Sequence, residues 1–548
     1  LLTDAVPAEV PRVAAIVTLT PATPNSHVAI LAKTFGIPFV YAREPAMQAR
    51  LQALVGKEAL LRSIPAAVEE GAVGCKVQAF EATNLTPTGR AELLSLKAPR
   101  PVTIVPKDGT GPLTSDTAQL RPSDLGRFGG KASNFGSLRR SVAQNSPAAL
   151  GISFTLWNAF MAQPTAGGGT LQSAILARLA PFQEPVTDVA ALEAALVEIR
   201  TLIDAASVPT AQQAPLLQAL QDFGFVPTQK AKFRSSTNVE DGAELSGAGL
   251  YDSYSGCLAD DLDTDTAGPS LCDPEEPKEK GALAAIRKAY RSFYNTGAVL
   301  ERIRYGLDET KVGMALLVNK SFPDAEEAAN GVVTFTLPSW GGMSATMVSQ
   351  VGAESITNPE GSSRPEVAQL LCYDENAANC TVSFSQGSSR LPIGGHVLAN
   401  PADYQGFAGL FLAAGAQFLA DLQLPEGTDT TLDVEYKKTT DGTLFVKQIR
   451  LVPRPAVDTT PFYFNVPTPM CVYAQEGGDL LATHRTKASF SLELGNRLFD
   501  ATEPTRPMVS TVNGTVRADG ASQALQGPVS AFPSAAFGTE PLGDGLSE

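Results

Sequence analysis

A histidine near the start of the chain stands where a phosphoryl group could be held. His27 follows Thr23-Pro-Asn-Ser26 and opens a helix-like run that ends near Phe35. Thr23 and Ser26 are good capping residues, and the first turn of a helix offers free N–H donors and a positive dipole end to an anion. Because a lone histidine in such a place is more often a plain capping residue, His27 alone leaves both interpretations open.

Two other segments carry groups that bind polyphosphate. The segment Lys232-Phe-Arg-Ser-Ser-Thr-Asn-Val-Glu-Asp241 includes Arg234, whose guanidinium can bind two phosphate oxygens at once and keeps its charge. Earlier, glycines between Gly126 and Gly136 precede and follow Lys131, so backbone N–H groups and an ammonium could reach phosphates at the start of a predicted helix. This spacing does not match a Walker A loop, and by itself it predicts only a Gly-rich turn.

Two strand-like runs near residue 440 carry a possible magnesium clamp. Along the first, alternation puts Asp433 and Glu435 on one face; along the second it does the same for Gln448 and Arg450. Mg²⁺ prefers a few carboxylate or amide oxygens together with substrate oxygens, and a guanidinium beside them neutralises phosphate. For Asp433, a structural strand-end carboxylate is an equally good interpretation.

Composition excludes several function classes. The chain has 548 residues, 43% of them hydrophobic, and a net charge of −15, so it has no excess positive field for broad contact with nucleic acid or anionic membranes. No apolar run approaches the roughly 18 residues that would predict a transmembrane helix. The chain opens at Leu1 without a charged segment ahead of an apolar core, so we expect a cytoplasmic protein, or a fragment or processed form.

The six cysteines leave the compartment open. Cys257 and Cys272 bracket one polar stretch, and Cys372 and Cys380 bracket another. If these pairs are disulfides, the protein is exported to an oxidising compartment; if all six cysteines are reduced, they carry no chemistry. Only three histidines are present, which argues against a structural zinc site.

The fold class predicted is α/β with four regions. A compact α/β domain is expected at 1–85, a Pro-rich linker at 86–122, a large α/β domain at 123–455 and a small β-rich region of unknown role at 456–548. Helices are predicted at 27–35, 189–206 and 281–295. Strands are predicted at 14–18, 38–41, 312–318, 331–337, 431–436, 443–449, 489–494 and 508–516.

Several motifs together resemble the phosphoenolpyruvate synthase and pyruvate phosphate dikinase family. Ser26-His-Val-Ala-Ile-Leu-Ala-Lys33 with Gly36-Ile-Pro38 is similar to the segment around the phosphohistidine of the family's swivelling domain, although the glycines that normally precede it are replaced. Phe233-Arg-Ser-Ser-Thr-Asn-Val-Glu-Asp241 is similar to the family's Val-Arg-Ser-Ser-Ala-x-x-Glu-Asp. Leu432-Asp-Val-Glu-Tyr436 and Leu444-Phe-Val-Lys-Gln-Ile-Arg450 are similar to its Asp-Ile-Glu-Trp and Leu-Tyr-x-Leu-Gln-x-Arg strands.

This resemblance implies a role for each matched residue. It implies that His27 carries the phosphoryl group and that Arg450 contacts it during transfer. Glu435 and Gln448 would bind Mg²⁺. The implied ATP contacts are Lys131, Arg234, Arg302 and Asn319, the last at the hinge of an ATP-grasp-like domain with two subdomains.

The order of the domains bears on the acceptor. Here the histidine domain comes before the nucleotide domain, as in the glucan water dikinases, and no room remains for the barrel that binds pyruvate in the family. The resemblance therefore implies an ATP-dependent dikinase whose phosphoryl acceptor, a small molecule or a glucan, is unidentified. The alternatives are a nucleotide-binding or scaffold module that has lost transfer, and one part of a longer enzyme. The sequence indicates no oligomeric state.

Overall fold

The computed structural model describes most of the large α/β region and parts of both ends of the chain. The described residues are 1–4, 13–19, 32, 38–67, 73–84, 87, 90–91, 102–184, 186, 188–240, 249–263, 265, 267–338, 341–354, 356, 363–424, 430–452, 508–512 and 515–519. Two compact units make up the chain: Leu1–Leu2, Val40–Ala98 and Ala456–Glu548 form one, and Thr3–Phe39 with Pro99–Pro455 form the other. The predicted domain boundaries stay predictions.

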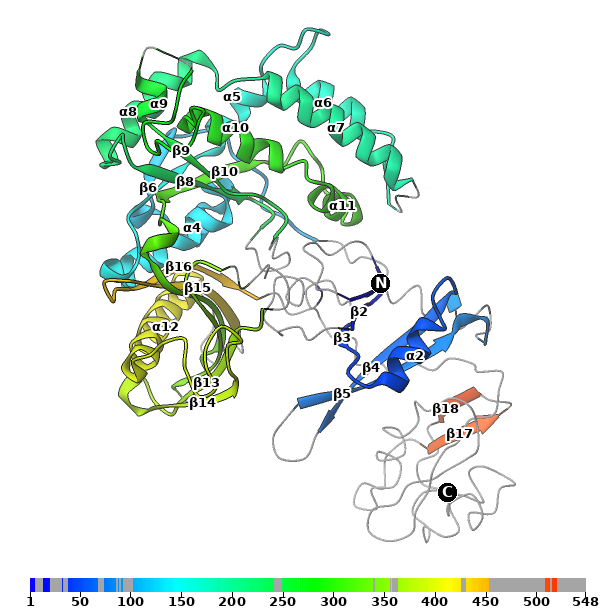
Figure 1. Ribbon diagram of the computed structural model, residues 1–548. Coiled ribbons are helices and arrows are strands. Elements are labelled where there is room, and N and C mark those ends of the chain that lie inside the picture. Colours follow the sequence, from blue (N-terminus) through cyan, green and yellow to red (C-terminus); the bar gives the residue numbers. More distant parts are fainter. Residues whose placement is uncertain are drawn as a thin grey trace, which may run out of the picture. The chain divides into compact units, whose positions relative to one another are not determined.

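The parts described near the two ends of the chain are small. Three short strands pair in the order β1-β2-β3, β4 pairs with β5, and β17 pairs with β18 (Figure 1). The bounds are β1 (Leu2–Thr3), β2 (Ile16–Thr18), β3 (Phe39–Tyr41), α2 (Pro45–Gln52), β4 (Ala59–Ala67), β5 (Val73–Glu81), β17 (Met508–Val512) and β18 (Thr515–Asp519). The predicted strands at 14–18, 38–41 and 508–516 are confirmed in part. The strand predicted at 489–494 lies outside the described residues, as does the helix at 27–35 apart from Ala32.

The large unit contains two antiparallel sheets (Figure 1). The first has the order β6-β7-β10-β8-β9, with β6 (Thr114–Asp116), β7 (Ala149–Ile152), β8 (Lys230–Thr237), β9 (Tyr254–Cys257) and β10 (Met314–Lys320). The second has the order β14-β13-β12-β11-β15-β16, with β11 (Glu327–Thr336), β12 (Met343–Val351), β13 (Glu366–Cys372), β14 (Cys380–Gln386), β15 (Thr431–Thr439) and β16 (Leu444–Leu451). The predicted strands at 312–318, 331–337, 431–436 and 443–449 are confirmed.

Helices cover the outer faces of the sheets (Figure 1). The first sheet packs against a helical core, and α12 packs against the second. The bounds are α4 (Leu125–Ser141), α5 (Phe154–Met161), α6 (Leu171–Leu179), α7 (Val189–Ala205), α8 (Thr210–Phe223), α9 (Ala259–Leu262), α10 (Ala282–Ser292), α11 (Thr296–Arg304) and α12 (Pro401–Asp421). The helices predicted at 189–206 and 281–295 are confirmed as α7 and α10. Among the described residues, no helix has both the length and the apolar character that a bilayer span requires.

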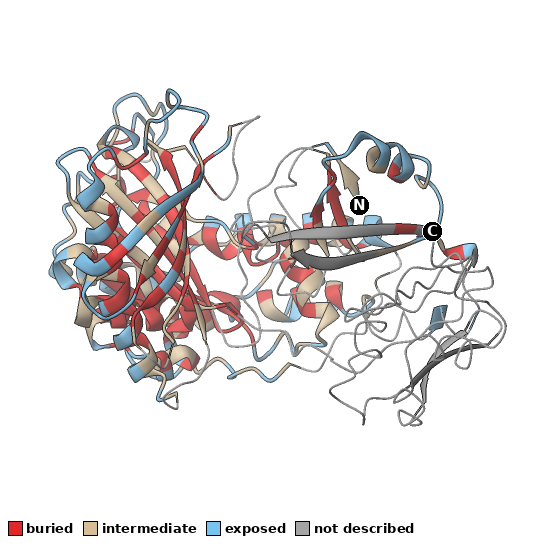
Figure 2. Ribbon diagram, turned by 90° about the horizontal axis from the view of Figure 1, so that it is seen from below, coloured by how far each residue is buried: buried red, intermediate tan, exposed pale blue. Residues whose placement is uncertain are grey.

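Sequence periodicity explains the packing of these helices. In α7 the buried residues Leu192, Leu196, Ile199 and Ile203 recur every three or four positions, which gives the helix one apolar stripe. The Asp188 side chain accepts a hydrogen bond from the Ala191 N–H at 2.8 Å and caps the first turn. Helix α4 differs, because its apolar residues share a core with β10 and with the second sheet. This helix therefore fixes one sheet against the other, and Figure 2 shows the buried residues gathered inside this unit.

The loop that joins β9 to α10 is held by a disulfide and by buried carboxylates. Cys257 and Cys272 form a disulfide. Asp260 accepts hydrogen bonds from the backbone N–H groups of Leu271 and Lys280, both at 2.8 Å. Asp261 accepts a bond from the Leu283 N–H at 3.1 Å and so caps α10. Burial raises the pKa of Asp261 to about 6.

We expect this capping carboxylate to make stability depend on pH. An acid whose folded pKa exceeds its unfolded value stabilises the fold below its unfolded pKa, and that contribution is lost as pH rises through about 6. Asp261→Asn keeps an acceptor for Leu283 and removes the charge. It should raise the free energy of unfolding at pH 8, by less than about 3 kcal/mol because solvent screens the group, and change it little at pH 4.

Urea unfolding at the two pH values, followed by tryptophan fluorescence, measures this difference. Trp157 is a suitable reporter because its ring packs edge-on against Tyr290 of α10, with centroids 4.9 Å apart. An equal effect of Asp261→Asn at both pH values would contradict the attribution of this pH dependence to the raised pKa of Asp261.

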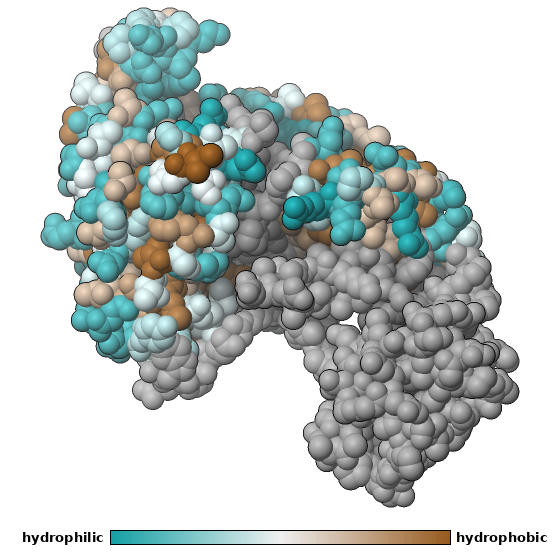
Figure 3. Space-filling view, turned by 60° about the horizontal axis from the view of Figure 1, so that its bottom comes forward, coloured by the Kyte–Doolittle hydropathy of each residue, from teal (hydrophilic) through white to brown (hydrophobic). Residues whose placement is uncertain are grey.

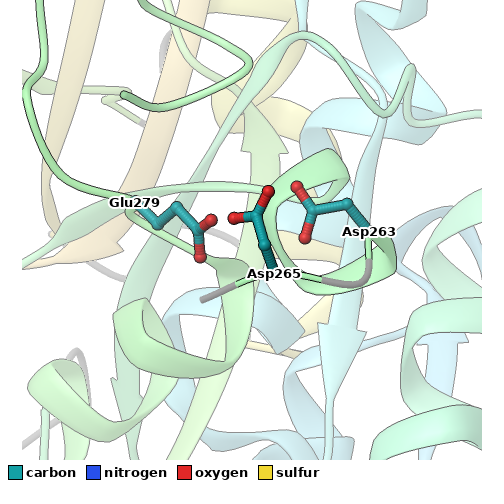
Figure 4. Close-up of side chains that lie close together, drawn as sticks. All are labelled: Asp263, Asp265 and Glu279. Carbon is teal, nitrogen blue, oxygen red and sulfur yellow. The ribbon is translucent and has the colours of Figure 1, made fainter. Parts of the chain in front are cut away.

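The same loop carries an exposed acidic cluster (Figure 4). Carboxylate oxygens of Asp263, Asp265 and Glu279 all lie within 4.8 Å of one another. A hydrogen bond from the protonated Glu279 to the Asp265 carboxylate raises the pKa of Glu279 to about 7. Crowded carboxylates resist ionising together, which is the physical cause of the raised pKa. On the face shown in Figure 3, hydrophobic residues are scattered among hydrophilic ones.

Candidate active site

The side chain of Arg234 joins the two sheets. Along β8, Ala231 and Phe233 point into the helical core, so alternation turns Lys232 and Arg234 toward the opposite face. The Arg234 Nη2 donates to Glu435 Oε2 at 2.9 Å and to Gln448 Oε1 at 2.8 Å, and its Nη1 donates to the Lys447 carbonyl at 3.2 Å. The guanidinium predicted to bind phosphate therefore contacts both residues predicted to bind Mg²⁺.

The register of β15 and β16 pairs the four predicted clamp residues. Glu435 lies opposite Gln448, and Asp433 lies opposite Arg450. The Arg450 Nε and Nη2 contact Asp433 Oδ2 at 2.8 and 2.6 Å, and both side chains are almost fully buried. The alternation predicted from the sequence is confirmed, and Asp433 holds the guanidinium of Arg450.

The oxygen atoms of Glu435 and Gln448 fit a magnesium site. One is a carboxylate and the other an amide oxygen, they stand on paired positions, and both meet the same Arg234 nitrogen. Mg²⁺ takes such oxygens and fills its other positions with water and substrate phosphate. A bound ion would exchange with the Arg234 contact and neutralise charge on the phosphate chain.

The glycine segment lies within a helix that bends. Helix α4 consists of two helical segments joined at a kink at Gly129, where φ is 72°. The break lies just before Lys131, where the sequence predicts a Gly-rich turn ahead of a helix. A Cβ at Gly129 would lie 1.9 Å from the Ser236 carbonyl oxygen, so only glycine allows this approach to β8. The Ser236 hydroxyl donates to the Phe128 carbonyl at 2.7 Å and accepts from the Ala132 N–H at 2.9 Å.

This bend brings Lys131 to the end of β8. The Lys131 Nζ lies 2.9 Å from Glu240 Oε1 and donates to Ser235 Oγ at 3.3 Å. Glu240 belongs to the same Arg-Ser-Ser segment, and sequence reasoning gave it no role. The sequence feature that could have drawn attention to Glu240 is the Glu-Asp pair that closes this motif. Lys131 of α4 thus contacts Ser235, the residue that follows Arg234 on β8.

Asn319 lies at the end of β10, directly before the linker to the second sheet. It pairs in register with Lys232, and its side chain is buried. Its Nδ2 donates to the Lys320 carbonyl at 2.9 Å. Within the described residues its Oδ1 has no donor. A buried acceptor of this kind is costly unless a ligand or water supplies a hydrogen bond.

Two clefts border the linker that follows Asn319. The larger, about 1050 Å³, is lined by strands β8 and β9 and by the linker, including Lys232, Tyr254 and Phe322. The smaller, about 440 Å³, lies beside Phe322 and Phe445. Neither cleft is lined by Arg234, Glu435 or Gln448. The clamp side chains contact one another instead, so phosphate would have to exchange with these contacts.

Three lysines crowd this end of the clamp, and sequence reasoning missed them as a group. Burial lowers the pKa of Lys437 to about 8, and it lowers the pKa of Lys447 well below the usual value. The pKa of Lys232 is lowered by burial and by the neighbouring Arg234. Lys447 stands where the family motif Leu-Tyr-x-Leu-Gln-x-Arg has its second leucine. This difference is the sequence feature that could have revealed the lysine.

Arg302 has a different setting from the other predicted nucleotide contacts. Only 2% of its side chain is exposed, and it forms an ion pair with Glu309 at 2.6 Å. Its Nη1 donates to the Phe293 and Ala298 carbonyls at 2.9 and 3.3 Å, and its guanidinium lies 3.9 Å from the Phe293 ring centroid. These contacts belong to the core around α10 and α11, so its role at the nucleotide stays a prediction. His27 lies outside the described residues.

Comparison with known protein families gives a match within the large unit. Residues 125–353 match the family model "Pyruvate phosphate dikinase, AMP/ATP-binding domain". The chain thus resembles these dikinases in its nucleotide-binding part. The match includes Lys131, Arg234, Arg302 and Asn319, and it ends before β15. No curated protein matches the chain.

Solved structures match the chain only weakly. One is the ADP complex of N5-carboxyaminoimidazole ribonucleotide synthetase, with 11% identity, a TM-score of 0.18 and coverage of 45% of this chain and 40% of that one. Another is D-alanyl-alanine synthetase A from Vibrio cholerae, with 9% identity, a TM-score of 0.16 and coverage of 45% and 48%. The chain therefore spans less than half the length of either structure.

Proposed function

We propose that the protein is an ATP-dependent phosphotransferase of the dikinase type. In this proposal ATP binds between the two sheets of the large unit and a phosphoryl group passes to His27. The histidine then hands it to an unidentified acceptor, a small molecule or a glucan. The observation that carries the proposal is the contact of Arg234 with both Glu435 and Gln448, within a chain whose residues 125–353 match a dikinase nucleotide domain.

The side chains present suit the charge that develops in such a transfer. A P–N bond to the His27 imidazole forms while a P–O bond of the phosphate chain breaks, and the leaving oxygen takes up negative charge. Lys131, Arg234 and Arg450 would neutralise this charge, and bound Mg²⁺ at Glu435 and Gln448 would supply further neutralisation. Such catalysis depends on positioning and electrostatics and needs little covalent chemistry from the protein. Asn319 would accept a hydrogen bond from the adenine amino group.

Labelled ATP tests the proposal. The full chain is incubated with Mg²⁺ and with ATP labelled at either the β- or the γ-phosphate. We expect acid-labile, alkali-stable label on the protein, and its absence from His27→Ala. Mass spectrometry of the labelled peptide locates the site, and comparison of the two labels identifies the phosphoryl group that moves. Alkali-labile label, or label retained by His27→Ala, would exclude His27 as the carrier.

A second candidate is an exported nucleotide-binding module without transfer activity. Two disulfides favour it: Cys257 with Cys272, and Cys372 with Cys380 across the β13–β14 pair. Disulfides persist mainly in oxidising compartments. ATP binding without any phosphohistidine would support this candidate. An alkylation mass shift that needs prior reduction would show that the disulfides exist in the isolated protein.

A further inference from the structure

A β-bulge places Lys447 on the face of the nucleotide site. The ladder between β15 and β16 slips one position after the pair of Glu435 with Gln448, because Tyr436 pairs with Val446 and Lys447 is skipped. Val446 and Ile449 both lie in the core beside α12 although they are three residues apart. The extra residue lets Lys447 and Gln448 both turn away from that core. Bulges often re-aim a side chain beside an active site.

Lys447 and Lys437 meet against the linker between the sheets. Their Nζ atoms lie 5.6 and 5.7 Å from the ring centroid of Phe322, and the two side chains hydrogen-bond to each other. Lys437 also pairs with the almost fully buried Glu327 of β11. The backbone carbonyl of Lys447 accepts the hydrogen bond from Arg234. The pair thus lies between Phe322 and the guanidinium predicted to bind phosphate.

Charged groups of both signs surround this pair. The cations near it are Arg234 and Lys232, and the acids are Glu435, Asp324 and Glu327. Glu435 pairs with Arg234, and Glu327 pairs with Lys437 itself. An oxyanion between the two amino groups would replace the hydrogen bond between them and accept a hydrogen bond from each.

We propose that Lys437 and Lys447 form a phosphate subsite that holds the phosphate attached to the ribose of the nucleotide. This inference rests on the proposed function. Phe322 follows Asn319 in the linker, where the nucleoside is expected, and Arg234 with Glu435 and Gln448 lies on the other side. The phosphate next to the ribose would therefore lie at the lysine pair, and the outer phosphates at the clamp.

AMP is the decisive probe, because it carries only this phosphate. Binding of AMP, adenosine, Mg–ATP and inorganic tripolyphosphate to the full chain is measured by calorimetry for wild type, Lys447→Leu and Lys437→Met. Each variant should bind AMP about tenfold or more weakly, as expected for a lost charge-assisted hydrogen bond, and should bind adenosine as wild type does. Lys438→Met is the matched control, because Lys438 is the next residue and pairs with Asp403 of α12, at 2.5 Å.

Each other outcome contradicts a specific statement. Unchanged AMP affinity in both folded variants would overturn the subsite, and so would an equal loss of adenosine affinity, which would assign the lysines to the nucleoside. If wild type bound tripolyphosphate with the expected sensitivity to Lys447→Leu but bound neither AMP nor ATP, the proposed function would fail while a phosphate subsite remained. If wild type bound none of the four probes, both proposals would fail.

Discussion

Arg234→Met is expected to lower phosphoryl transfer from ATP by about 1000-fold, the scale on which a single arginine stabilises a transferring phosphoryl group. The reason is geometric. The guanidinium meets Glu435 and Gln448 at 2.9 and 2.8 Å and also reaches the β16 backbone, so it positions the clamp and, in the proposed reaction, would also contact phosphate. Initial rates of acid-labile labelling at saturating Mg–ATP measure this loss.

Two companion variants separate charge from geometry. Arg234→Lys keeps a positive charge but cannot contact both oxygens in a planar fork, so we expect it to recover little of the activity. Arg127→Met is the control, because Arg127 is exposed on α4 and pairs with Asp108 at 3.3 Å. A labelling rate of Arg234→Met within about tenfold of the wild-type rate, in a chain with normal tryptophan fluorescence, would show that Arg234 does not stabilise the transition state.

The clamp strands could be predicted from the sequence because strand periodicity is local. Alternation alone assigned Asp433 with Glu435, and Gln448 with Arg450, to common faces, and the register confirms it. The bulge at Lys447 could not be predicted in this way. It depends on how β16 packs between the α12 core and Arg234, which is a tertiary property.

The glycine segment was harder to interpret because a glycine can either form a turn or allow two elements to approach closely. The sequence predicted a Gly-rich turn ahead of a helix at Lys131, and the backbone does break at Gly129, although a first helical segment already begins at Leu125. What selects glycine there is the Ser236 carbonyl of a strand about a hundred positions later.

The cysteines show the same limit of sequence-based prediction. The sequence left reduced and paired forms open, and the β13–β14 register places Cys372 opposite Cys380.

Arg302 illustrates how a motif match can conceal a structural role. The resemblance assigned it to the nucleotide, but the structure encloses it with Glu309, an acid seven residues further on. Arg302→Met would leave the Glu309 carboxylate, itself only 15% exposed, without its partner. Breaking a buried ion pair in this way costs about 3–5 kcal/mol. We therefore expect a loss of this size in the free energy of unfolding, measured by urea titration, and a small change for the more exposed Arg304→Met.

A double variant decides between the two roles of Arg302. In Arg302→Met with Glu309→Gln, both charges are gone, and the stability lost by the single variant should be partly regained because no buried charge is left unpaired. If the role is structural, this variant should bind Mg–ATP with nearly the wild-type affinity. If it is as stable as wild type yet binds ATP more than about tenfold more weakly, Arg302 contacts the nucleotide, as the sequence resemblance implies. Stability and affinity are therefore both measured on wild type, Arg302→Met, Arg304→Met and the double variant. Together they separate a side chain that supports the site from one that touches the ligand.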